Sequence, residues 1–332
     1  MITNGSVTKG SIIKYGFFLL LMVLVPYLVE DNYILHLLIV SLVWANVVTN
    51  WNLTLGYGGM FHIAQPTFLA VGAYMAGISA ARWGLSPWIC LAIGGIGTFM
   101  TSIIIGIPSL RVKGIYLILL TFALHFTVSE VVFHLKDYTG GSMGLTVPTF
   151  QLGSIEFSSV NLAPFYYIAL LSLIATLVVA RILIRSNIGK ALIATRDSEV
   201  LAVSCGINLY KFKLITFSVA AFMTGIAGAF YSHYVMVIGP ELFNFGQIVN
   251  GFGMIVVGGI GTFMGPVLGS FAIIFLSELF RDIESFRPII VGAIIILTLI
   301  FAPKGILHEL EKFSEKVKLL FVRGLKGKKV SP

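Results

Sequence analysis

A small set of polar side chains lies in or beside long apolar runs of the sequence. The set comprises amides, one imidazole and one carboxylate: Asn46, Asn50, Gln65, His125, Glu130, Gln247 and Asn250. In a membrane such groups need a partner or a water-filled cavity, because an ionised side chain at the bilayer centre costs about 2.5–3.5 kcal/mol. These residues are therefore candidates for lining the path of a small polar molecule. The alternative at each position is a structural hydrogen bond.

The motifs of ATP hydrolysis and of intramembrane catalysis are missing from the sequence. The segment Gly258–Gly265, GGIGTFMG, lacks the Lys-Ser/Thr ending and the preceding strand of a phosphate-binding loop. Neither an H-E-x-x-H nor a G-x-S-x-G pattern occurs. The two cysteines, Cys90 and Cys205, suggest neither a disulfide framework nor a metal site. We therefore expect no enzymatic activity, cofactor or metal in this chain.

The composition predicts an integral membrane protein. The mean hydropathy is +0.97, and only 11% of the residues are charged, against about 25% in soluble domains. Because each span needs roughly 20 apolar residues, the apolar runs predict an all-α bundle of about 8–10 transmembrane helices with broken or re-entrant glycine-rich segments. The net charge of +8 comes from Lys and Arg at the ends of these runs. They are topology signals, so we expect no nucleic-acid binding.

The chain divides into residues 1–303, a membrane domain, and residues 304–332, a basic amphipathic tail. The expected spans are 12–29, 34–50, 65–81, 88–107, 115–134, 164–184, 214–234, 246–260, 266–280 and 288–302. With this assignment the strongly basic loops and both termini are cytoplasmic, as the positive-inside rule requires of a cell-membrane protein. Loop 135–163 then lies outside. The runs 246–260 and 266–280 can instead be two half-helices that dip in and back.

The cytoplasmic loop 185–213 reads as two short helices rather than a plain connector. Ser186 or Asn187 can cap the first helix, and Asp197 or Ser198 can cap a second that ends at Gly206. One face of the first helix would comprise Ile188, Ala191, Leu192 and Thr195. Two capped helices in a basic loop favour a docking surface for another protein. The alternative is a solvated loop that only satisfies the charge bias.

Two glycine-rich breaks, one in each half of the chain, point to a translocation pathway. They are GYGGMFHIAQP, which follows the span 34–50, and the irregular region at Gly246–Gly265. A proton-coupled secondary transporter would use Glu130 and Glu278 as relays, although the spans hold few such carboxylates. Sodium coupling is a separate alternative, because it would use Asn, Ser, Thr and carbonyl groups. A passive channel for a small polar solute such as urea is a further alternative.

Four segments, in this order and spacing, resemble permeases of branched-chain amino acid ABC transporters of the LivM type. They are LGYGGMFHIAQPTFLAVGAY at 55–74, LRVKGIYLILLTFA at 110–123, TGGSMGL at 139–145 and VVGGIGTFMGPVLGSFAIIFLSEL at 256–279. The resemblance covers most of the chain. It implies a permease subunit of an importer that works by alternating access. It further implies three kinds of partner: separate ATP-binding cassette subunits, a second permease subunit and an extracytoplasmic binding protein that delivers a small-molecule substrate.

The same resemblance implies that the cytoplasmic loop docks in a cleft of the ATPase subunit. The loop residues expected to matter are Gly189, Arg196, Asp197, Glu199, Ala202 and Gly206. Ala202 and Gly206 would allow close packing, and the charged residues would make polar contacts. In the stricter family form E-A-A-x-x-x-G, the first two places are occupied here by Val200 and Leu201.

Overall fold

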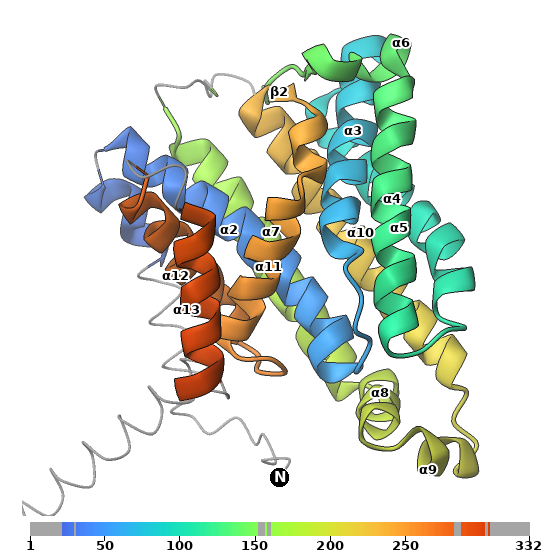
Figure 1. Ribbon diagram of the computed structural model, residues 1–332. Helices are drawn as coiled ribbons and strands as arrows, with labels where there is room; N and C mark the ends of the chain where they lie inside the picture. The colour runs from blue at the N-terminus through green and yellow to red at the C-terminus, as the bar shows by residue number, and fades with distance from the viewer. Residues whose placement is uncertain are drawn as a thin grey trace, which may run out of the picture.

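The computed structural model describes residues 22–29, 31–151, 157, 161–281, 287–302 and 305. Nine long helices dominate this part of the chain (Figure 1). They are α2 (Asn32–Asn52), α3 (Gln65–Trp83), α4 (Pro87–Ser109), α5 (Ile115–His134), α7 (Ala163–Arg185), α10 (Leu209–Val235), α11 (Phe245–Gly258), α12 (Gly265–Leu279) and α13 (Arg287–Phe301). The predicted all-α membrane bundle is confirmed. Most of the expected first span, 12–29, lies outside the described residues, which show helix over 22–28.

Within the described residues, five helices are long and apolar enough to cross a membrane. They are α4, α5, α7, α10 and the segment Asn32–Tyr57, which joins α2 to the π-helical turn η1 (Leu53–Tyr57). The helices α11 and α12 have 14 and 15 residues, too short at about 1.5 Å per residue to cross a core of about 30 Å. They pack against each other. The expectation of two short apolar pieces around GTFMG is therefore confirmed.

Small residues bring α3, α4 and α10 into close contact. A Cβ atom on Gly225 of α10 would overlap the hydroxyl of Thr98 and lie 2.7 Å from the carbonyl oxygen of Gly94, both on α4. A Cβ atom on Gly228 would overlap the carbonyl of Leu69 on α3. The hydrophobic effect does not drive helices together in lipid. Close backbone packing of this kind stabilises the bundle instead.

The connection between α5 and α7 contains short elements that the sequence did not reveal. They are α6 (Lys136–Thr139), η2 (Gly141–Met143) and β1 (Leu145–Thr146). The strand β1 pairs antiparallel with β2 (Val237–Ile238), and Leu145 lies opposite Ile238. Two residues are too few for an alternating pattern, so the pairing is not visible in the sequence. Within the described bundle this sheet lies at the end opposite to α8 (Asn187–Asp197) and α9 (Glu199–Ser204) (Figure 1).

The close packing at Gly225 predicts a large cost for any added side chain there. Gly225→Val should lower the free energy of unfolding by about 1–3 kcal/mol or more, because overpacking displaces backbone. The unfolding temperature in detergent measures this. Gly292→Val on α13 is the matched control, because nothing lies within 4 Å of its added Cβ atom. Equal unfolding temperatures for the two variants would contradict the packing argument.

Candidate functional site

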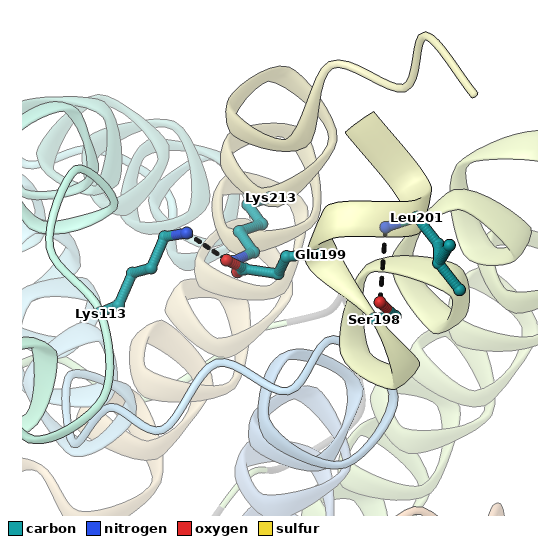
Figure 2. Close-up of polar contacts among 5 residues, drawn as sticks. All are labelled: Lys113, Ser198, Glu199, Leu201 and Lys213. Atoms are coloured by element: carbon teal, nitrogen blue, oxygen red, sulfur yellow. Dashed lines mark hydrogen bonds and ion pairs between the residues drawn. The ribbon is translucent and has the colours of Figure 1, made fainter. Parts of the chain in front are cut away.

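The loop between α7 and α10 forms two capped helices, as the sequence predicted. The Ser186 hydroxyl accepts from the N–H groups of Ile188 and Gly189, at 3.2 and 3.5 Å, at the start of α8. The Ser198 hydroxyl accepts from the N–H of Leu201 at 3.4 Å, at the start of α9 (Figure 2). Serine is therefore the cap at both positions where the sequence left two choices open.

Gly206 ends α9 because of its backbone conformation. Its φ is +79°, and nothing lies within 4 Å of the place where a Cβ atom would be. The N–H of Ile207 donates to the carbonyl of Ala202 at 3.0 Å, and the N–H of Gly206 donates to that of Val203 at 2.8 Å. This pair of bonds is a Schellman motif, which requires a left-handed residue. Glycine here serves the helix end and not close packing within this chain.

The helix α8 lies against the membrane domain through the face that the sequence predicted. Ala191, Leu192 and Thr195 are buried, and Ile188 is half-buried. A Cβ atom on Gly189 would overlap the carbonyl of Ile184 at the end of α7. Gly189 therefore permits the tight corner between α7 and α8.

Glu199 attaches α9 to two other parts of the chain. Its carboxylate accepts hydrogen bonds from Lys113, in the connection between α4 and α5, and from Lys213 on α10, the latter at 2.6 Å (Figure 2). Burial by itself raises the pKa of this carboxyl group, but the bonds to the two lysines outweigh it, so the pKa lies below its ordinary value. Glu199 is therefore ionised at neutral pH and anchors the loop.

Arg196 attaches α8 to the first glycine-rich break. Its Nη1 atom donates to the carbonyl oxygen of Gly56 at 3.0 Å. The same guanidinium donates to Asp197 Oδ1 at 3.0 and 3.1 Å. Arg196 and Glu199 thus contact their own chain, whereas Asp197 keeps an exposed side chain.

The outward surface of α9 is apolar, which the sequence reading missed. Val200, Leu201 and Val203 are 76%, 67% and 57% exposed, while Ala202 between them is 3% exposed. In the sequence, Val200 and Leu201 stand out only as departures from the family motif E-A-A-x-x-x-G. The signal was present in the helical spacing, which places Ala202 alone on the inner face. We name Val200, Leu201 and Val203 the α9 patch.

A partly open pocket of about 750 Å³ lies between helices beside the N-terminal half of α2. Its walls come from α2, α10, α11, α12 and α13, and include apolar residues and amides: Leu37, Val40, Trp44, Ile273, Ile274, Asn244, Gln247 and Asn250. Gln247 and Asn250 are three residues apart on α11, so they share one face. Both are half-buried, and neither side chain makes a hydrogen bond to another described residue.

The other candidate path residues lie outside this pocket. Asn46, Asn50, Gln65 and His125 are at most 2% exposed, and their side chains bond within the bundle: Asn46 to Ser172, Asn50 to Asn46, Gln65 to Ala220 and Thr224, and His125 to Thr67 and Phe243. These contacts match the structural alternative considered for each. Glu130 differs, because its side chain is 71% exposed beside His134. Glu130 therefore lies apart from the four buried residues and from the pocket.

Comparison with known proteins identifies the family of this chain. Residues 33–303 match the family described as branched-chain amino acid transport system / permease component. The high-affinity branched-chain amino acid transport system permease proteins LivM of Salmonella typhimurium and Escherichia coli are each 25% identical over 324 residues, covering 90% of this chain and 76% of theirs. LivH of Salmonella typhimurium is 25% identical over 294 residues, covering 81% of this chain and 93% of its own. No solved structure matches.

The helical bundle, its apolar spans and its glycine-rich breaks define an all-α, multi-pass membrane permease. The chain belongs to the family of permease components of branched-chain amino acid transport systems.

The ion pairs of Glu199 predict a pH-dependent and salt-dependent stability. Glu199→Gln should lower the unfolding temperature at pH 7 by roughly 1–3 °C, because two partly exposed ion pairs are lost. The pKa of Glu199 is lower in the folded protein than its ordinary value of 4.5, so its ion pairs contribute their full stability at pH values above the ordinary one. This contribution disappears as the pH falls through the folded-state pKa. The gap between wild type and variant should therefore close in acid, and narrow in 0.5 M salt.

Glu130→Gln is the matched control, since its carboxylate is exposed and contacts only His134 among the described ionisable partners. We expect it to leave the unfolding temperature at pH 7 unchanged. A Glu199→Gln gap that stays constant from pH 7 into acid would show that the ion pairs do not anchor the loop.

Proposed function

We propose that this chain is one of two permease subunits of an ABC importer for branched-chain or other small amino acids. Transport would proceed by alternating access, driven by a separate ATPase subunit. The observation that carries the proposal is the α9 patch, an exposed apolar surface on a helix that the rest of the chain holds firmly in place.

The α9 patch supports docking of another protein. Three neighbouring apolar side chains that are more than half exposed are typical of an interaction surface when they lie on a rigid element. The patch also lies on a short helix between two membrane helices, where basic residues such as Arg185 and Lys190 favour the cytoplasm. Because the sequence has no nucleotide-binding motif, the ATP-hydrolysing partner must be a separate chain.

The pocket supports the translocation path. A polar side chain that finds no partner within the protein is costly in a membrane, so Gln247 and Asn250 are suited to contact water or a polar solute. The apolar wall around Trp44 and Ile273 is suited to a hydrophobic side chain. A zwitterionic amino acid with a branched apolar side chain offers both kinds of group, and the relatives named above are permeases for such amino acids.

The proton-coupled alternative receives less support. Of the two carboxylates that it would use as relays, Glu130 is exposed and Glu278 is paired with Arg281 at 3.4 Å and with the hydroxyl of Tyr33. A proton pathway across a bundle generally needs a chain of such groups. Among the described residues these two do not form one.

The end opposite to α8 supports contact with an extracytoplasmic binding protein. There the sheet of β1 and β2 ties the connection after α5 to the connection between α10 and α11. A protein that docks on this sheet would lie above the helix α11, which lines the pocket.

Reconstitution tests the proposed function directly. The chain is co-expressed with its neighbouring transport genes, purified and placed in proteoliposomes, and uptake of labelled leucine, isoleucine and valine is measured. We expect uptake only with ATP, the ATPase subunits and the binding protein. Uptake by this chain alone, driven by a proton or sodium gradient, would instead establish the secondary transporter, and non-saturating flux without ATP would establish a channel.

The α9 patch predicts that a charge within it prevents assembly. Leu201→Asp should reduce recovery of the ATPase subunit with the purified permease at least tenfold, because a buried, unpaired charge would face the partner. Met143→Asp is the matched control. Met143 is 93% exposed at the opposite end of the bundle, so its variant should retain the ATPase. Normal recovery with Leu201→Asp would refute docking at this patch.

The pocket predicts a specific effect on substrate affinity. Gln247→Leu and Asn250→Leu should each raise the KM for leucine uptake roughly tenfold, because each removes a hydrogen bond to a charged group. Assembly with the ATPase subunit should be unchanged. Thr127→Val is a control, since its hydroxyl bonds only to the carbonyl of Ala123 on the same helix. An unchanged KM in both amide variants would remove the pocket from the path.

A further inference from the structure

The side chain of Asn52 connects the end of α2 to the turn between α11 and α12. Its Oδ1 atom accepts from the N–H of Gly261 at 2.7 Å, and its Nδ2 atom donates to the carbonyl of Thr262 at 2.8 Å. Asn52 is 2% exposed. One amide therefore satisfies a backbone donor and a backbone acceptor of the second glycine-rich break.

The two breaks also touch through their backbones. A Cβ atom on Gly56 would lie 2.5 Å from the N atom of Gly261 and would overlap Oδ1 of Asn52. Gly261 has a φ of +75°, which glycine adopts without strain. Glycine at both places therefore allows the breaks to pack directly against each other. The two residues are 205 positions apart in the sequence.

The same junction meets the cytoplasmic loop through Arg196. The guanidinium of Arg196 donates to the carbonyl of Gly56. A Cβ atom on Gly59, whose φ is +63°, would lie 2.9 Å from Arg196 Cγ. The contacts thus run without a gap from α8, through the first break and Asn52, to the turn that joins α11 and α12. The helix α11 carries Gln247 and Asn250 near its other end.

We propose that Asn52 is a positioning residue that transmits movement of α8 to the pocket. With both hydrogen bonds in place, α2 and the pair α11–α12 follow α8 as one body when the ATPase subunit shifts it. Loss of the bonds lets α8 move without α11, so that ATP is hydrolysed without a matching change at the pocket. This inference rests on the proposed function, and it names the route by which the docking loop acts on the path.

The experiment compares three versions of the full complex in proteoliposomes, with leucine as the probe. Asn52→Leu removes both hydrogen bonds at similar volume. Asn52→Asp keeps the acceptor for the N–H of Gly261 and loses the donor to Thr262. We expect leucine transported per ATP hydrolysed to fall about tenfold in Asn52→Leu and by a smaller factor in Asn52→Asp, because coupling energies of this size come from one or two hydrogen bonds. The KM for leucine should change less than twofold.

A matched core variant separates coupling from stability. Phe230 lies in the hydrophobic core, 1% exposed, and its ring packs against Phe150 and Tyr234, away from the hydrogen bonds of Asn52 and Arg196. We expect Phe230→Leu to lower the unfolding temperature while transport per ATP stays as in wild type. An equal loss of transport per ATP in Phe230→Leu and Asn52→Leu, or a ratio in Asn52→Leu within twofold of wild type, would overturn the inference.

A second measurement needs no transported substrate. Arg196→Ala should raise amide hydrogen exchange over residues 259–264 severalfold in the assembled complex, and it should add little in the Asn52→Leu background, because residues in one chain of contacts are not additive. If Arg196→Ala leaves amide hydrogen exchange over residues 259–264 unchanged, the route through Asn52 is refuted. Absence of ATP-dependent leucine uptake by the wild-type complex, with this exchange pattern intact, would refute the proposed function alone.

Discussion

The absence of water inside a bilayer constrains this structure more than any other condition. Every backbone group freed by a break in a helix must find a partner in the protein. At the first break the indole of Trp51 donates to the carbonyl of His62 at 2.8 Å, and the imidazole of His62 meets the hydroxyl of Thr54 at 2.8 Å. At the second break Asn52 satisfies the turn. The breaks exist only because neighbouring side chains complete their hydrogen bonds.

This constraint also explains where the loop between α7 and α10 is attached. The carbonyl of Gly56 lies in a π-helical turn, where the regular bonding of α2 ends. Arg196 donates to it from α8, so the loop that we propose as the docking element is bonded to an irregular turn of a membrane helix. Glu199 adds a second attachment through Lys113 and Lys213. A loop held in this way can push or pull on the membrane domain, whereas a loosely tethered one cannot.

The sequence predicts the features that depend on short stretches of chain. Apolar length identifies the spans, and a serine cap with a terminal glycine identifies α8 and α9. Features that depend on residues far apart in the chain cannot be predicted from the sequence. Asn46 and Gln247 look alike in sequence, since each is an amide in an apolar run. Only the fold shows that Asn46 bonds to Ser172 and that Gln247 faces a pocket. The pairing of β1 with β2, about ninety residues apart, is hidden for the same reason.

The contrast between bonded and free amides separates two uses of polarity in this bundle. Asn46 and Gln65 each join two helices by hydrogen bonds. In lipid no solvent group competes for these bonds. Gln247 and Asn250 stand on the first turns of α11, a helix too short to cross the membrane, and so face a partly open space instead of a neighbouring helix. The short helix α11 brings amides to a pocket wall and ends in a turn bonded to α2. In the function that we propose, being only half a span lets α11 combine contact with a solute and attachment to the moving part.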